Sequence, residues 1–282
     1  GADFFHAIDT MKERLNANAV AIQVPMGAED QFWGVIDLVT MTAWDFKPDD
    51  KGMTYPEPMD EIPAEFADVA AEKRAELLDA AANYDDELMM MVLEDEEIPV
   101  DMLKAAIRKG TLANELNPVL VGSAYKNKGV QELLDAVVDY LPSPLDVPAV
   151  EGTNPKTGET ETREASADAP FSALAFKIAT DPFVGKLTFF RVYSGHVDAG
   201  SYVTNATSGS RERFGRILEM NANDRVDVDG ASAGDILAAV GLKNTTTGDT
   251  LCEEGKELIL EQIEFAKPVI DIAIEPKTKA EQ

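Results

Sequence analysis

This sequence contains few of the residues that build disulfides and metal sites. Its 282 residues include one cysteine, Cys252, and two histidines, His6 and His196. A single cysteine cannot form an internal disulfide, which suits a reducing, cytoplasmic environment. The histidines lie far apart in the chain with no cysteine nearby. The ligand spacing of a zinc site is therefore missing, and no metal site is predicted.

Long apolar runs and a phosphate-binding loop are also missing. No segment reaches the roughly 18 consecutive apolar residues that a membrane-spanning helix needs. The pattern Gly-x-x-x-x-Gly-Lys-Ser/Thr does not occur, and its nearest approach, Gly185-Lys186, is followed by Leu187. Such a loop is the usual cradle for nucleotide phosphates. No catalytic residue is predicted in this sequence.

Basic residues are scarce and unevenly placed. The chain has 25 Lys and Arg against 52 Asp and Glu, a net charge of −27. Between Asp45 and Asp101 there are 19 acidic and 4 basic residues, whereas between Lys177 and Arg225 there are 7 basic and 5 acidic residues. An acidic part and a slightly basic part can present different surfaces to different partners. The alternative is that the acidic residues only keep the protein soluble.

Hydrophobic periodicity predicts a mixed α/β region in the first half of the chain. Asp3 is placed to cap the first helix, and Pro63 is placed as the first residue of a later one. Residues 63–92 have the spacing of one long helix or two, and residues 47–62 are predicted to be a loop. The other predicted helix ranges are 3–15 and 101–109, and the predicted strands are 20–25, 32–39 and 41–46.

A strand followed by a helix is predicted near the middle of the chain. Residues 117–123 are a short apolar run without polar alternation, which is typical of a buried parallel strand. Residues 129–141 place leucine and valine side chains on one helical face. Ligands of such sheets bind at the carboxyl ends of strands, so the loop 122–128 is a candidate binding loop. Small residues there allow main-chain N–H groups to point at a carbonyl oxygen such as guanine O6.

The second half of the chain is predicted to be all β. Residues 146–170 have the composition of a linker. Residues 171–179 and 186–193 alternate with period two around Asp181-Pro182 and Gly185, which is a hairpin signal. Further runs separated by glycines are typical of a small β-barrel or sandwich. They are 201–205, 212–219, 225–229, 235–240 and 258–265, with one more strand predicted at 268–276.

Five runs, in the same order along the chain, resemble the bacterial elongation factor G family of translational GTPases. Residues 1–5 resemble the segment after that family's Asn-Lys-x-Asp guanine box, and 25–38 resemble the start of its inserted G-prime subdomain. Residues 122–144 resemble the fifth GTPase motif with the last helix of the GTPase domain. Residues 176–195 resemble domain II, and 268–279 resemble the first strand of domain III.

The resemblance implies an α/β remnant of a P-loop GTPase domain with an α+β insertion subdomain, followed by an all-β barrel of the translation-factor domain II type. Residues 1–145 would be the C-terminal part of the GTPase domain, with G-prime at about 20–115. Residues 146–170 would be a linker and 171–266 domain II. Residues 267–282 would be the truncated start of domain III.

The resemblance also implies a function for a longer parent protein, which would hydrolyse GTP, with Mg²⁺ and GTP or GDP as ligands, to drive translocation of tRNA and mRNA on the ribosome. Ser123, Ala124 and Tyr125 would form part of the guanine site. The phosphate loop, the switch regions and the Asn-Lys-x-Asp box are absent from this sequence. Phosphates and Mg²⁺ supply most of the binding and the catalysis in such enzymes. This chain alone is therefore expected neither to bind nor to hydrolyse GTP, and to carry no cofactor.

The implied partners are parts of the ribosome. Domain II would contact small-subunit rRNA, and G-prime would bind the ribosomal stalk protein, while tRNA and mRNA would be contacted by parts outside this sequence. Arg211 and Arg213, two apart on a predicted strand, would share one face and could reach phosphate oxygens. The candidate rRNA contacts are Lys186, Arg191, Arg211, Arg213 and Arg216. Ion pairing of the arginines with Glu212 and Glu219 is the alternative.

Two other functions stay open on the sequence. One is a paralogous translational GTPase, such as a ribosome-protection or recycling factor, which would share the barrel. The other is a non-catalytic acidic interaction module with a β-barrel binding face.

Overall fold

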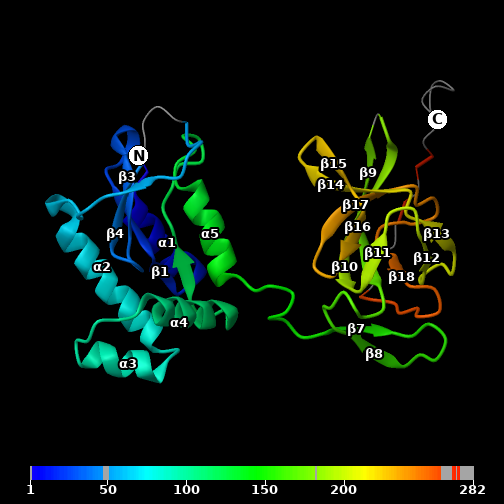
Figure 1. The fold of residues 1–282 in the computed structure, drawn as a ribbon, viewed down its shortest axis with the longest axis horizontal. Helices are drawn as coiled ribbons and strands as arrows, with labels where there is room; N and C mark the ends of the chain where they lie inside the picture. The colour runs from blue at the N-terminus through cyan, green and yellow to red at the C-terminus, as the bar shows by residue number, and fades with distance from the viewer. Residues whose placement is uncertain (1, 47–50, 182, 262–268, 271, 274–282) are drawn as a thin grey trace. The chain divides into compact units, whose positions relative to one another are not determined.

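The computed structural model describes residues 2–46, 51–181, 183–261, 269–270 and 272–273 (Figure 1). The chain divides into two compact units, Gly1–Pro142 and Ser143–Gln282. The first unit mixes helices and strands, and the second is built from strands, as the periodicity predicts. None of the helices in the described ranges combines the length and the apolar character that crossing a bilayer would take.

The first unit contains a four-stranded antiparallel sheet and a two-stranded parallel one. The antiparallel sheet has the order β2 (Gln23–Met26), β3 (Gly34–Asp37), β4 (Thr42–Asp45) and β5 (Glu57–Pro58). The predicted strands at 20–25, 32–39 and 41–46 are present in shortened form. β5 lies inside the segment predicted to be a loop. A single-turn helix, η1 (Glu29–Gln31), separates β2 from β3.

Five α-helices accompany these sheets: α1 (Phe4–Leu15), α2 (Ala64–Ala82), α3 (Asp86–Leu93), α4 (Val100–Leu112) and α5 (Val130–Tyr140). Asp3 caps α1 by accepting a hydrogen bond from the His6 N–H at 3.0 Å, as predicted. The region 63–92 forms two helices, because Asp85 caps a second start by accepting from the Leu88 N–H. Pro63 is the N-cap of α2 rather than its first helical residue. One buried core joins helices and strands, and it includes Val24, Ile36, Leu77, Leu103 and Ile107.

The predicted strand and helix near residue 120 are present, but they are less buried than their apolar sequence suggests. β6 (Asn117–Val119) pairs in parallel with β1 (Ala19–Ala21). Its residues are exposed or half-buried rather than buried, because β1 is the one strand that it pairs with among the described residues. The apolar face of α5 is also exposed, with Leu134 at 60% and Val138 at 80% exposure. The prediction of a buried strand is therefore wrong in its burial and right in its direction.

The second unit begins with a hairpin inside the segment predicted to be a linker. β7 (Val150–Thr153) pairs with β8 (Thr160–Arg163). An antiparallel bridge also joins Thr153 to Ile259, with each N–H donating to the other carbonyl at 2.8 Å. Much of 146–170 is thus regular structure attached to the rest of its unit.

The main sheet of the second unit has eight antiparallel strands in the order β13-β12-β18-β9-β10-β17-β14-β15. The predicted hairpin forms its centre, as β9 (Ser172–Asp181) and β10 (Gly185–Ser194). The remaining strands are β12 (Tyr202–Asn205), β13 (Arg211–Arg213), β14 (Arg216–Asn221), β15 (Asp224–Val228), β17 (Ile236–Val240) and β18 (Thr250–Cys252). A separate ladder joins β11 (His196–Asp198) to β16 (Gly230–Ser232).

The sheet curves around one apolar core. Phe190, Phe214, Ile217 and Leu251 come from different parts of the second unit and share a single buried cluster. The Phe214 ring packs edge-on against Phe190 at 5.1 Å between centroids. Of the predicted strand 258–265, the described part contains only the bridge at Ile259, and residues 262–265 lie outside the described residues. The predicted strand 268–276 falls largely outside them as well.

Candidate functional site

The loop 122–128 is a tight hairpin closed by main-chain hydrogen bonds. The Ser123 N–H donates to the Lys128 carbonyl at 2.9 Å, and the Lys128 N–H donates back at 3.0 Å. A glycine at each end allows this closure. A Cβ on Gly122 would lie 2.8 Å from the Lys128 carbonyl oxygen, and Gly129 adopts φ +78° at the start of α5. The loop therefore projects from the carboxyl end of β6, where the parallel-strand argument places a ligand.

The tip of this loop presents unpaired main-chain donors. Within the part of the chain that the structure describes, the N–H groups of Ala124 and Tyr125 have no hydrogen-bond acceptor. The Tyr125 side chain is 99% exposed. The Ser123 N–H differs from these two, because the turn itself uses it. Of the three predicted guanine-binding residues, two thus have a main-chain donor available.

Arg211 and Arg213 form the densest basic surface of the second unit. On β13 they project to the exposed side, and Glu212 between them is buried. The guanidinium of Arg211 lies 4.1 Å from the ring centroid of Tyr202, and that of Arg213 lies 5.8 Å from it. The prediction that the two arginines share one face is confirmed.

Ion pairs neutralise some of the predicted RNA-contact residues. Arg211 pairs with Glu254 at 3.0 Å, and Arg216 makes a bidentate pair with Asp227, both bonds at 2.7 Å. The bond from Arg216 holds the pKa of the Asp227 carboxyl below its usual value. These partners are not the ones considered from the sequence. Glu212 instead accepts hydrogen bonds from the N–H groups of Lys243 and Asn244.

The other basic candidates contact neutral groups. Arg213 Nε donates to the Gly200 carbonyl at 3.0 Å, and Lys186 Nζ donates to the Thr245 carbonyl at 2.6 Å. The guanidinium of Arg191 lies 5.1 Å from the Tyr193 ring centroid. A carbonyl or ring partner leaves the positive charge uncompensated. Arg213, exposed and next to Tyr202, is therefore the best placed to meet a phosphate.

The second unit can now be compared with known proteins. Residues 185–252 match a family model. That family is elongation factor Tu domain 2. The match covers β10 to β18, including all five candidate basic residues, while the loop 122–128 lies outside it. The mixed α/β unit is thus joined to a large antiparallel sheet of the translation-factor domain 2 type.

A solved structure has the same fold over nearly the whole chain. The match is to a protein of Thermus thermophilus, with a TM-score of 0.73 and 23% sequence identity. It covers 99% of this chain and 39% of the other, so this chain spans about two fifths of the length of that protein. At this identity the likeness establishes the fold alone.

The domain 2 region also contains a pattern that the prediction of no catalytic residue did not consider. Residues 230–234 read Gly-Ala-Ser-Ala-Gly, the Gly-x-Ser-x-Gly motif of many serine hydrolases. In the structure Ser232 Oγ lies 2.8 Å from His196 Nδ1, and His196 Nε2 lies 3.1 Å from Asp198 Oδ1. A serine, a histidine and an aspartate are therefore in line.

The surroundings of Ser232 do not support hydrolysis. The N–H groups of Ala233 and Gly234 donate to the carbonyls of Gly195 and Val192, so they cannot form an oxyanion hole. Ser232 lies on a β-ladder rather than on a strand-to-helix turn, and Asp198 is exposed. The motif is part of the domain 2 region, and the prediction of no catalytic residue in this chain stands as a prediction.

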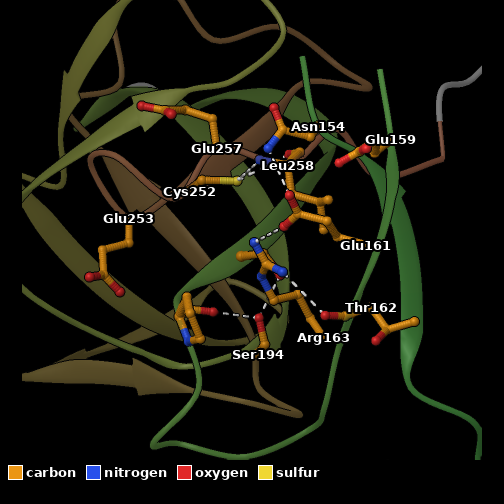
Figure 2. A network of polar contacts seen from close by, with 12 residues as sticks. Asn154, Glu159, Glu161, Thr162, Arg163, Ser194, Cys252, Glu253, Glu257 and Leu258 are labelled. Atoms are coloured by element: carbon orange, nitrogen blue, oxygen red, sulfur yellow. Dashed lines mark hydrogen bonds and ion pairs between the residues drawn. The ribbon is translucent and has the colours of Figure 1, made fainter. Parts of the chain in front are cut away.

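A polar network attaches the β7–β8 hairpin to this domain (Figure 2). Arg163 pairs with Glu161 at 2.9 Å, and Asn154 donates to the same carboxylate at 2.7 Å. Nearby, Leu258 N–H and carbonyl both bond to the Cys252 sulfur (Figure 2). Burial raises the pKa of the Cys252 thiol to about 11, so it is not a nucleophile at neutral pH. No group of three or more His, Cys, Asp or Glu in the described ranges could hold a metal ion.

Proposed function

We propose that this chain is part of a translational GTPase of the elongation factor G type, which acts in the cytoplasm and promotes translocation of tRNA and mRNA on the ribosome. The match of residues 185–252 to elongation factor Tu domain 2 carries the proposal. The shared fold over 99% of the chain supports it. In that protein the acidic first unit would bind the ribosomal stalk protein.

The loop 122–128 would contribute to guanine recognition. Ala124 and Tyr125 would donate their main-chain N–H groups to the base oxygen, since these donors have no partner within the described residues. A guanine nucleotide with Mg²⁺ would bring the phosphates whose transfer to water is the reaction. Residues outside this sequence would hold those phosphates, because it contains no phosphate-loop pattern.

The domain 2 surface would contact small-subunit rRNA through Arg213 and its neighbours. Arginine bound to a carbonyl can exchange that partner for a phosphate oxygen without breaking an ion pair. Each phosphate neutralised in this way releases counterions, so binding becomes weaker as salt rises. Arg216 would contribute less, because Asp227 already compensates its charge.

This proposal is tested on a full-length protein that carries this sequence, by measuring ribosome binding over a range of salt concentrations. We expect Arg213→Ala to weaken binding and to reduce the slope of log K against log salt by about one. The matched control is the double variant Arg216→Ala with Asp227→Ala, which leaves the net charge unchanged. A full-length protein without ribosome-stimulated GTP hydrolysis would contradict the proposed function, and an unchanged slope for Arg213→Ala would contradict the RNA contact.

A further inference from the structure

Three consecutive side chains of the loop 122–128 reach residues far earlier in the chain, at separations from 75 to 97 positions. Lys126 Nζ donates to the Glu29 carbonyl at 3.1 Å and pairs with Asp30 at 3.3 Å. Lys128 Nζ donates to the Phe32 carbonyl at 2.7 Å and lies 5.9 Å from its ring centroid. These bonds attach the loop to the turn between β2 and β3.

Asn127 attaches the loop to a different segment. Its Nδ2 donates to the carbonyls of Lys51 and Gly52, at 2.9 and 3.3 Å. Gly52 adopts φ +70°, and a Cβ there would overlap the Asn127 carbonyl oxygen. The two backbones therefore touch directly, which requires glycine at position 52.

The first turn of α5 strengthens this second attachment. Gln131 Nε2 donates to the Gly52 carbonyl at 2.8 Å, and the Tyr55 hydroxyl donates to Asp135 Oδ2 at 2.6 Å. Residues 51–55 thus run along both the loop and the helix that follows it. Asn127 itself has φ 52°, a left-handed conformation that asparagine tolerates better than most residues.

The bonds are distributed unequally within the loop. All three attached side chains belong to its second half, from Lys126 to Lys128. The first half keeps the main-chain donors of Ala124 and Tyr125 without acceptors in the described structure. A binding loop works best when supporting contacts fix its geometry and leave its ligand-facing donors available. Side chains that hold the loop from behind meet both requirements.

We propose that Lys126, Asn127 and Lys128 are positioning residues for guanine recognition. They would hold the N–H groups of Ala124 and Tyr125 at the base oxygen through bonds to residues 29–32 and 51–52. A displacement of the β2–β5 sheet or of residues 51–55 would then change how tightly the base is held. This inference rests on the proposed function and assigns support of its base-recognition loop to named side chains.

The first experiment uses this chain without nucleotide and measures ¹⁵N relaxation at residues 124 and 125. Asn127→Gly removes the side-chain donor and keeps a residue suited to positive φ, so the turn itself is preserved. We expect the order parameters of Ala124 and Tyr125 to fall from about 0.85 toward about 0.6. Unchanged order parameters in both Asn127→Gly and Lys128→Met would overturn the proposal.

The second experiment measures dissociation of a fluorescent GDP analogue from a full-length protein that carries this sequence. We expect Asn127→Gly and Lys128→Met each to raise the dissociation rate about three- to tenfold, the effect of losing one hydrogen bond. Lys128→Arg keeps a donor that can reach the Phe32 carbonyl and should restore the slower rate. Lys104→Met is the matched control, because it removes the Lys104–Asp139 ion pair of 2.7 Å without touching the loop.

The outcomes separate this inference from the proposed function. A wild-type protein that does not bind GDP would contradict the proposed function, and the inference with it. A wild-type protein that binds GDP, with unchanged dissociation in the Asn127 and Lys128 variants, would overturn the inference alone. Faster dissociation in the Lys104 control to the same extent would also overturn it, because the effect would then reflect general destabilisation.

Discussion

At the scale of single residues, Glu132 is the most costly group in the first unit. It is 7% exposed, and neither carboxylate oxygen has a hydrogen-bond partner among the described residues. It lines a cavity of about 90 Å³ together with Asp37, Tyr55 and Tyr140. Burial, and to a smaller degree the charge of Asp135, raise the pKa of Glu132. An ionised carboxylate in this position therefore works against folding.

The raised pKa gives a pH-dependent prediction for Glu132→Gln. Below the unfolded-state pKa the carboxyl is neutral in both states, so the substitution changes the charge of neither. As pH rises through the higher folded-state pKa, the wild-type protein loses stability that the variant keeps. We expect the variant to have a free energy of unfolding about 1–3 kcal/mol higher at pH 8. The gain should shrink as the pH falls toward the unfolded-state pKa.

Urea denaturation at several pH values measures this difference. The control is Glu65→Gln, which removes a carboxylate from an exposed position on α2. A gain for Glu132→Gln that does not change with pH would contradict the explanation from buried charge.

Residue partners were harder to predict than residue faces. The period of two in a strand places Arg211 and Arg213 on one side from sequence alone. Their partners depend on contacts across the fold. Glu254 is 43 residues from Arg211 along the chain and meets it only after folding. The long-range anchors of the loop 122–128 were likewise out of reach of any local pattern.

At the scale of elements, α5 shows what a sequence pattern can and cannot establish. Its helical period was correct, and the apolar face exists. The pattern does not say what covers that face, and in the described structure Leu134 and Val138 are exposed. Exposed apolar surface of this kind favours association.

We expect the isolated chain to self-associate at high concentration through α5. The double variant Leu134→Lys with Val138→Lys should shift it to a monomer, because two charges on the face oppose its burial. Light scattering across a concentration series measures the change. The control is Leu93→Lys, at a leucine 74% exposed on α3. A wild-type chain that stays monomeric at high concentration would contradict the prediction.

The β7–β8 hairpin shows the opposite limit. Its residues are polar and rich in Thr and Glu, so composition indicated a linker. The strands form because pairing and side-chain bonds supply what apolar alternation does not. Lys156 pairs with Glu257 at 2.9 Å, and Thr153 bonds to Ile259. Such partners are visible only in three dimensions.

At the scale of the whole molecule, sequence patterns established the division into an α/β unit and a β unit. The central hairpin β9–β10 and the presence of most strands were predictable, because alternation and turn residues are local signals. The core of each unit joins residues distant in the chain, and only the structure shows which ones meet.

The composition of the whole chain also predicts its behaviour toward nucleotide. The loop 122–128 offers donors for a base, but the sequence contains no phosphate-loop pattern. Because phosphates and their metal ion provide most of the affinity in such proteins, we expect no measurable heat when GDP is titrated into this chain. Isothermal calorimetry tests this directly, and a micromolar dissociation constant would contradict it.

The buried sulfur of Cys252 has a practical consequence. Its thiol is inaccessible and has a pKa of about 11, so maleimides and other thiol reagents should leave it unmodified at neutral pH. The wild-type sequence is therefore already suited to site-specific labelling. A cysteine introduced at the exposed position of Tyr125 would be the one reactive thiol, and a fluorophore there would report on the loop during nucleotide binding.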